Sequence, residues 1–113
     1  LFRTNQRIAF DELARRRGDY ALVGCGMIAA LDGTRIETIR IAFFAVGNVP
    51  TRAKSAEAVL NGHALEAARI AAAQAALEKD LAPPDSDEVP RAMRLHLARV
   101  LLGRLLGRIA EGA

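Results

Sequence analysis

Three groups of residues have types that could do chemistry, and the first is Gly24-Cys25-Gly26. A dinucleotide-binding loop needs the spacing G-x-G-x-x-G and a helix directly behind it, so that backbone N–H groups point at a pyrophosphate. These residues lie inside a strand pattern instead, and we predict no phosphate site there. Cys25 is the single cysteine, so no internal disulfide can form. We expect a buried structural thiol in a reducing compartment, namely the cytoplasm.

The two histidines and a cluster of acidic residues form the other groups. His96 has no nearby carboxylate to orient it as a general base, and we expect both His63 and His96 to lie at a surface or an interface. Asp85, Asp87 and Glu88 lack the residue spacing of a calcium-binding loop, and acidic residues before a helix commonly serve as caps. The sequence contains no nucleophile elbow, zinc-ligand spacing or phosphate loop, which argues against a free-standing enzyme.

The run from Arg15 to Gly24 carries the most information about function. Three consecutive arginines fit the negative end of a helix dipole, and Gly18 can take the left-handed conformation that ends a helix. These rules do not account for Asp19 and Tyr20. One interpretation is therefore a charged helix end followed by an ordinary strand, and the other is a functional loop.

Three stretches, in this order, resemble the C-terminal domain of the FAD-binding (medium) subunit of molybdenum hydroxylases, the carbon monoxide dehydrogenase and xanthine dehydrogenase family. The first begins at Phe10 and continues through acidic residues, arginines and Asp-aromatic-Ala to Val23; the others are Pro50–Gly62 and Arg94–Leu101. The resemblance extends to about Leu106. It is incomplete at Met93, where the family usually has tyrosine, and at Leu22, where some members have a basic residue.

The resemblance implies that Arg16, Arg17, Asp19 and Tyr20 are cofactor-binding residues beside a flavin. It also implies FAD in the full-length subunit, with the molybdenum cofactor and iron–sulfur clusters in partner subunits. Residues 1–113 would then be a single domain cut from a longer FAD-containing electron-transfer subunit. This domain would wall the flavin site and dock against an upstream FAD-binding domain and against the molybdenum and iron–sulfur subunits. On its own it would neither bind FAD tightly nor turn over substrate. The alternative is a non-catalytic protein-interaction or assembly module.

The elements that must position these residues follow from hydrophobic periodicity. Gln6–Arg17 is predicted as a short helix, and Asp19–Leu31 and Arg35–Val46 as a long β-hairpin that turns at Asp32-Gly33. Thr51–Ala53 is a candidate edge strand. In the first hairpin strand, Val23, Cys25, Met27 and Leu31 share a face, and Gly24 and Gly26 leave the other face flat for close approach. In the return strand, Ile39, Ile41 and Phe43 are expected on one face, with Ile36, Thr38 and Arg40 on the other.

Three helices complete the pattern. They are predicted from Ser55, as N-cap, to Leu60; from His63 to Leu81; and from Val89 or Pro90 to Ala110. In the second, Ile70, Ala73, Leu77 and Leu81 share a face. The leucines of the last helix cover more than one face, which fits either a contact with another domain or subunit, or burial within its own domain. The fold class is α+β: a small antiparallel sheet packed against about three C-terminal helices.

Charge and hydropathy exclude two classes of partner. Sixteen Lys and Arg against thirteen Asp and Glu give a net charge of +3, and no aromatic residues interleave with the arginines as stacking platforms. We therefore expect no nucleic acid partner. No run approaches the roughly 20 apolar residues that span a bilayer. A docking face separated from its partners would let the fragment self-associate weakly.

Overall fold

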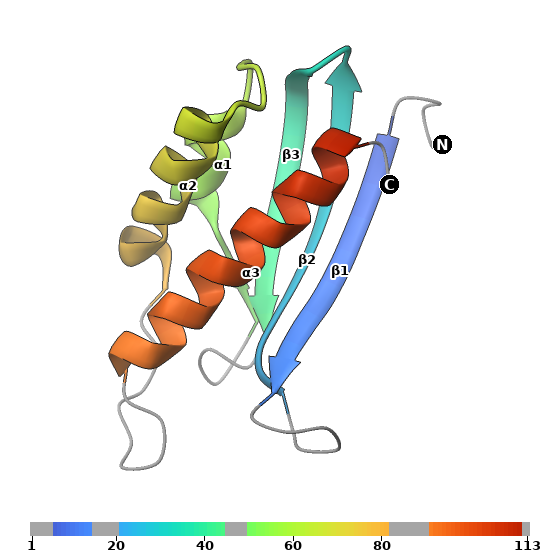
Figure 1. Cartoon of the computed structure of the whole chain (residues 1–113). Coiled ribbons are helices and arrows are strands. Elements are labelled where there is room, and N and C mark those ends of the chain that lie inside the picture. Colours follow the sequence, from blue (N-terminus) through green and yellow to red (C-terminus); the bar gives the residue numbers. More distant parts are fainter. Residues whose placement is uncertain (1–5, 15–20, 45–49, 82–90, 112–113) are drawn as a thin grey trace.

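The computed structural model describes residues 6–14, 21–44, 50–81 and 91–111, which form two layers (Figure 1). One layer is an antiparallel sheet in the order β1-β2-β3-β4, whose strands are β1 (Gln6–Ala14), β2 (Ala21–Asp32), β3 (Arg35–Phe44) and β4 (Thr51–Arg52). The other layer is α1 (Lys54–Leu60), α2 (Ala67–Asp80) and α3 (Arg91–Glu111), packed on one face of the sheet. The predicted α+β class is confirmed, as is the edge strand.

The predicted helix over Gln6–Arg17 is wrong for the residues that the structure describes. Residues 6–14 form β1, which pairs antiparallel with β2 at the edge of the sheet. Ala9 and Leu13 face the helices, whereas Ile8 and Phe10 point to the opposite side. A strand with apolar residues on both faces has no simple alternation, and its apolar positions can be mistaken for a helical stripe.

The hairpin of β2 and β3 is confirmed, with its turn at Gly33 and Thr34, one residue later than predicted. Gly33 has a φ of 64°, a conformation that glycine adopts without steric cost. The predicted inward face of β2 is buried: Val23, Cys25, Met27 and Leu31.

The predicted orientation of Ile36 is wrong, because the pairing between β2 and β3 shifts by one residue. Leu31 lies opposite Ile36, but its neighbour Ala30 lies opposite Thr38, so β3 has an extra residue at this point. Such a bulge reverses the alternation of side chains. Ile36 is consequently fully buried on the same side as Ile39.

The core lies between the sheet and the helices, and α3 contributes half of its buried leucines. This helix contacts β1, β2 and α2, and six of its residues have no exposed area: Ala98, Leu101, Leu102, Leu105, Leu106 and Ile109. The excess of leucine is thus accounted for by burial within the domain, which was one of the two interpretations. In α2, Ala73 and Leu77 are buried on the predicted face, Leu81 follows the helix and Ile70 packs against them. No helix within the described ranges is long and apolar enough to cross a membrane.

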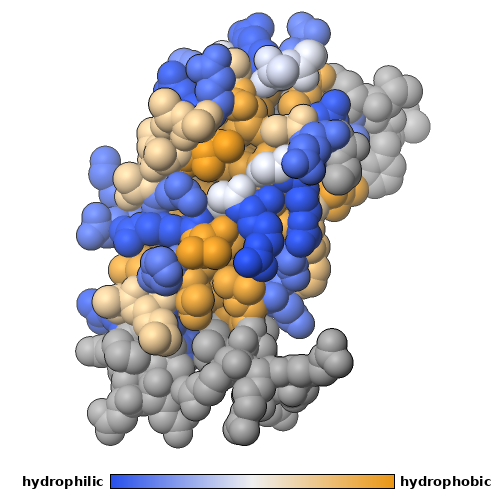
Figure 2. Space-filling model, in the orientation of Figure 1, coloured by the Kyte–Doolittle hydropathy of each residue, from blue (hydrophilic) through white to orange (hydrophobic). Residues whose placement is uncertain are grey.

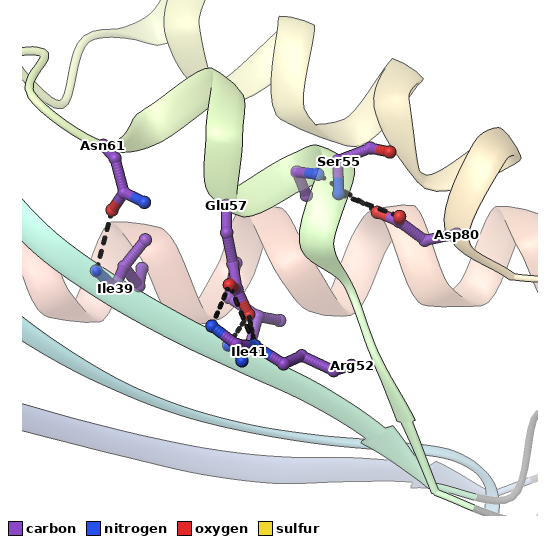
Figure 3. A network of polar contacts seen from close by, with 8 residues as sticks. Ile39, Ile41, Arg52, Ser55, Glu57, Asn61 and Asp80 are labelled. Carbon is purple, nitrogen blue, oxygen red and sulfur yellow. Dashed lines mark hydrogen bonds and ion pairs between the residues drawn. The ribbon is translucent and has the colours of Figure 1, made fainter.

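The start of α1 differs from the prediction. Ser55 is not its N-cap; Ala53 holds that position and makes no side-chain cap hydrogen bond. The backbone N–H groups of Ser55 and Ala56 instead donate to the two carboxylate oxygens of Asp80, at 2.8 and 3.0 Å (Figure 3). The cap is supplied by the end of α2, distant in sequence, so a local pattern could not reveal it.

The edge of β3 that faces away from β2 is paired only briefly by β4. The N–H of Ile39 donates to the side-chain oxygen of Asn61, and that of Ile41 donates to Glu57, both at 2.9 Å (Figure 3). The N–H of Ile36 donates to the carbonyl of His63, also at 2.9 Å. Residues of α1 and the segment after it therefore occupy this edge in place of a longer strand.

Candidate functional site

The four cofactor-binding residues predicted from the sequence, Arg16, Arg17, Asp19 and Tyr20, lie outside the described residues. They belong to the connection between the end of β1 at Ala14 and the start of β2 at Ala21. The sheet surface nearest to these two positions is therefore the part of the molecule in which a functional site can be assessed.

The face of the sheet opposite the helices, here called the outer face, carries exposed apolar side chains beside polar ones such as Thr38 and Arg40. Its large exposed side chains are Ile8 on β1, 60% exposed, Phe10 beside it, 58% exposed, and Phe44 at the end of β3, 39% exposed. Antiparallel sheets that have one face in water normally carry polar residues on that face. By contrast, hydrophilic side chains cover much of the helical layer, with apolar side chains visible between them (Figure 2).

Two glycines of β2 form the floor between the aromatic rings. The ring centroids of Phe10 and Phe44 are 6.3 Å apart and the rings are inclined at 57°. A Cβ added at Gly26 would lie 3.4 Å from the ring of Phe10 and 3.8 Å from that of Phe44, and one at Gly24 would contact Phe44 and Glu12. Because Gly24 and Gly26 have no Cβ, the rings of Phe10 and Phe44 can pack closely on the backbone of β2 and near each other.

An open groove of about 360 Å³ runs beside Gly26, with Ile28, Ala42 and Phe44 along it. Arg40 and Arg52 also line it, and the charge of Arg52 is paired with the carboxylate of Glu57. This combination of apolar walls and a cationic border can bind a flat apolar surface that carries an acidic group at one edge.

Arg52 belongs to the second family-like stretch, and the structure gives that stretch a structural role. Its guanidinium donates from Nε and Nη2 to the carboxylate of Glu57, at 2.8–3.0 Å, and Glu57 also accepts the buried N–H of Ile41 (Figure 3). Glu57 is only 4% exposed. Its hydrogen bonds and charge raise the pKa of Arg52 above the ordinary value. The pair therefore fixes α1 and β4 to β3.

The third family-like stretch, Arg94–Leu101, also serves the fold. Ala98 and Leu101 are buried, and Leu95 and Leu97 pack against the core. Near the other end of α3, Arg108 donates to Asp11 of β1 at 2.8 Å. The N–H of Glu12 and the guanidinium of Arg108 lower the pKa of Asp11. This pair joins the last helix to the edge strand.

The cysteine and the two histidines, the remaining described candidates for chemistry, lie in the core or at the surface. Burial raises the pKa of the Cys25 thiol to about 12, as expected for an unreactive core residue. His63 and His96 are both exposed. The acidic cluster at positions 85–88 lies outside the described residues. Within the ranges that the structure describes, no three His, Cys, Asp or Glu side chains are grouped so that they could hold a metal ion.

The sequence indicated the outer face only in part. The flatness at Gly24 and Gly26 was predicted, but the exposed Ile8 and Phe10 were assigned to a helix. No simple alternation in the sequence marked these two residues, because the inner positions of β1 include Arg7 and Asp11, which contact α3, as well as Ala9 and Leu13.

Residues 8–109 match the family model of the CO dehydrogenase flavoprotein C-terminal domain. The carbon monoxide dehydrogenase medium chain of Afipia carboxidovorans is 31% identical over 105 residues, which are 93% of this chain and 36% of that one. The alpha subunit of the 6-hydroxypseudooxynicotine dehydrogenase complex of Paenarthrobacter nicotinovorans is 33% identical over 106 residues, with the same coverage of both chains. The chain therefore spans little more than a third of the length of these curated relatives.

Solved structures show the same fold. The Cu,Mo-CO dehydrogenase in its cyanide-inactivated form superposes with a TM-score of 0.88 at 30% identity, covering 100% of this chain and 40% of the other. Quinoline 2-oxidoreductase from Pseudomonas putida 86 superposes with a TM-score of 0.86 at 33% identity, covering 96% and 38%.

Proposed function

Because the chain belongs to the family of CO dehydrogenase flavoprotein C-terminal domains, we propose that it walls one side of the flavin site in the FAD-containing electron-transfer subunit of a molybdenum hydroxylase. FAD is held in the full-length subunit, and the molybdenum cofactor and iron–sulfur clusters are held by partner subunits. The domain docks against the upstream FAD-binding part and against those subunits. We also assign it to the cytoplasm, in keeping with its single free cysteine.

One observation carries the proposal. The family model matches residues 8–109, nearly the whole chain, and so includes every described strand and helix apart from two residues at either end. A likeness of this extent, at 30% identity to a solved CO dehydrogenase, concerns the same domain and not merely the same fold class.

The proposed cofactor-side residues are Arg16, Arg17, Asp19 and Tyr20. Residues 15–20 join the neighbouring strands β1 and β2, and those strands are held in register by pairs from Gln6 with Ala30 to Ala14 with Ala21. A charge placed close to a flavin changes its reduction potential, which is how a protein adjusts such a cofactor.

The test is a domain exchange. Residues 6–111 replace the C-terminal domain of the A. carboxidovorans medium chain, and the FAD content of the purified subunit is measured. We expect about one FAD per subunit, and loss of FAD from the exchanged subunit would contradict the proposal. The chain alone should not bind FAD with micromolar affinity, which a fluorescence titration checks.

A charge variant tests the cofactor-side residues in the same exchanged subunit. Asp19→Asn removes a negative charge that would disfavour the reduced flavin, so the flavin midpoint potential should rise. The control is Lys54→Ala, an exposed residue at the start of α1, which should leave the potential unchanged. Equal potentials for the wild type and Asp19→Asn would remove Asp19 from the flavin site.

A further inference from the structure

We propose that the outer face of the sheet is the surface on which the flavin-binding part of the same polypeptide packs. This inference rests on the proposed function. The occupant is a mainly apolar protein surface with an acidic group opposite Arg40.

The distribution of residues on β1 is the first argument. Ile8 and Phe10 point outward and are more than half exposed, whereas Arg7 and Asp11 point inward to α3, where Arg7 donates to the carbonyl of Ile109 at 2.6 Å. The inner face of β1 is thus already in contact with α3. A strand that places its largest apolar side chains on the side without helices gains from a second layer there, because apolar area removed from water is stabilising.

The shape of the outer face is the second argument. Gly24 and Gly26 lie at the centre of the sheet, on β2, where glycine weakens a strand and has no side chain to pack. Together with the groove beside Ile28, they leave a shallow apolar surface with walls at Phe10 and Phe44. The rings of Phe10 and Phe44 lie over the glycines, so these rings and the groove beside Ile28 are the surface that an occupant would contact.

The identity of the occupant follows from the relatives and from the connectivity. The matched family is a C-terminal domain, and the chain covers only 36% of the medium chain of carbon monoxide dehydrogenase, so most of that subunit lies outside this domain. The segment proposed to approach the flavin leaves β1 four residues after Phe10 and enters β2 three residues before Gly24. An interface on the outer face is therefore continuous with the proposed flavin side of the domain.

Thiol labelling tests the inference. The native Cys25 should not react with the reagent, because it is buried and burial raises its pKa to about 12. Ile8→Cys places a thiol on the outer face, and Met93→Cys places one on α3, where Met93 is 50% exposed. Each variant is labelled with a charged thiol reagent in the chain alone and in the exchanged medium subunit. We expect Ile8→Cys to react at least about tenfold more slowly in the subunit, and Met93→Cys to react equally in both.

Each outcome decides the matter. Equal reactivity of Ile8→Cys in both proteins overturns the inference while the FAD content of the exchanged subunit still supports the proposed function. Loss of FAD from that subunit overturns both. Protection of Ile8→Cys in the chain alone that disappears on dilution would assign the face to a second copy. Protection of the chain alone by free FAD would assign it to the flavin itself.

Discussion

At the scale of single residues, the buried carboxylate of Glu57 links three elements of the fold. It lies on α1, accepts the backbone N–H of Ile41 on β3 and pairs with Arg52 on β4. An ionised group is stable in a buried position only when its oxygens are satisfied, as they are here. The spacing from Arg52 to Glu57 in the second family-like stretch thus serves packing.

Removing this carboxylate should destabilise the domain. Glu57→Ala leaves the Ile41 amide buried without its acceptor, and we expect the free energy of unfolding to fall by about 2–3 kcal/mol. Glu57→Gln keeps an oxygen for that amide and should cost less. Urea unfolding followed by circular dichroism measures both. The matched control is Glu66→Ala, an exposed residue that makes no side-chain cap bond, and a similar loss there would contradict this account.

Asp11 gives the domain a predictable dependence on pH. Its pKa is lowered, first by the N–H of Glu12 and then by Arg108, so its contribution is present above the ordinary pKa of 3.8 and is lost as the pH falls through the folded-state value. Asp11→Asn should lower the free energy of unfolding by about 0.5–1 kcal/mol near neutral pH, because the pair is partly exposed. The difference should shrink as the medium is acidified.

Unfolding of the wild type and Asp11→Asn at several pH values checks this expectation. Arg108→Met removes the guanidinium that pairs with Asp11, so the free energy of unfolding should depend less on pH than in the wild type. The double variant should be little less stable than either single variant, because both substitutions remove the same interaction. If the stability difference between the wild type and Asp11→Asn grew towards acidic pH, the pKa of Asp11 would be raised on folding, which would contradict this account.

At the scale of elements, α3 shows how one helix can use two glycines differently. A Cβ at Gly103 would lie 2.5 Å from Nε2 of Gln74 on α2, and that amide donates to the carbonyl of Arg99 at 2.8 Å. A Cβ at Gly107 would meet nothing within 4 Å. Gly103 therefore permits the close contact of α2 with α3. Gly107 has no such role, and it destabilises the helix because glycine loses more backbone entropy on folding than alanine does.

The two positions should respond differently to alanine. Gly107→Ala should raise the free energy of unfolding by about 0.5–1 kcal/mol, the difference in helix propensity. Gly103→Ala gains the same propensity but displaces the Gln74 side chain, and we expect a net change near zero. Thermal unfolding of both variants measures the contrast. Equal stabilisation of the two would show that Gln74 gives way at no cost.

The helices and the hairpin could be predicted from local sequence, because their signals are local. Asp32-Gly33 marks the turn, and the apolar stripe of α2 is regular. Three features depend on contacts distant in sequence and could not be predicted: β1, whose polar residues meet α3; the bulge that buries Ile36; and the Asp80 cap of α1. Of the candidate site, the glycine floor was predicted, but the walls at Phe10 and Phe44 required the sheet register.

At the scale of the whole molecule, one core joins both layers, and Cys25 lies within it. The thiol is on the central strand β2, which α3 covers, and has no exposed area. A reagent can reach it only when the layers separate. Its reactivity therefore reports the opening of the whole domain.

Labelling of Cys25 should thus be very slow in the native state. We expect it to be at least about 1000-fold slower than in urea-unfolded protein, the ratio set by a typical folding equilibrium. Its dependence on urea should have the slope of equilibrium unfolding. Rapid labelling without urea would mean that α3 opens from the sheet separately.

The two edges of the sheet differ in how far they can pair with another strand. Along β3, α1 and the segment after it accept the backbone N–H groups, whereas β1 forms the edge on the other side. A strand from another molecule therefore cannot pair with β3. Addition of a further strand, whether in normal assembly or in amyloid-like aggregation, would start at β1, because β4 at the other edge has only two residues.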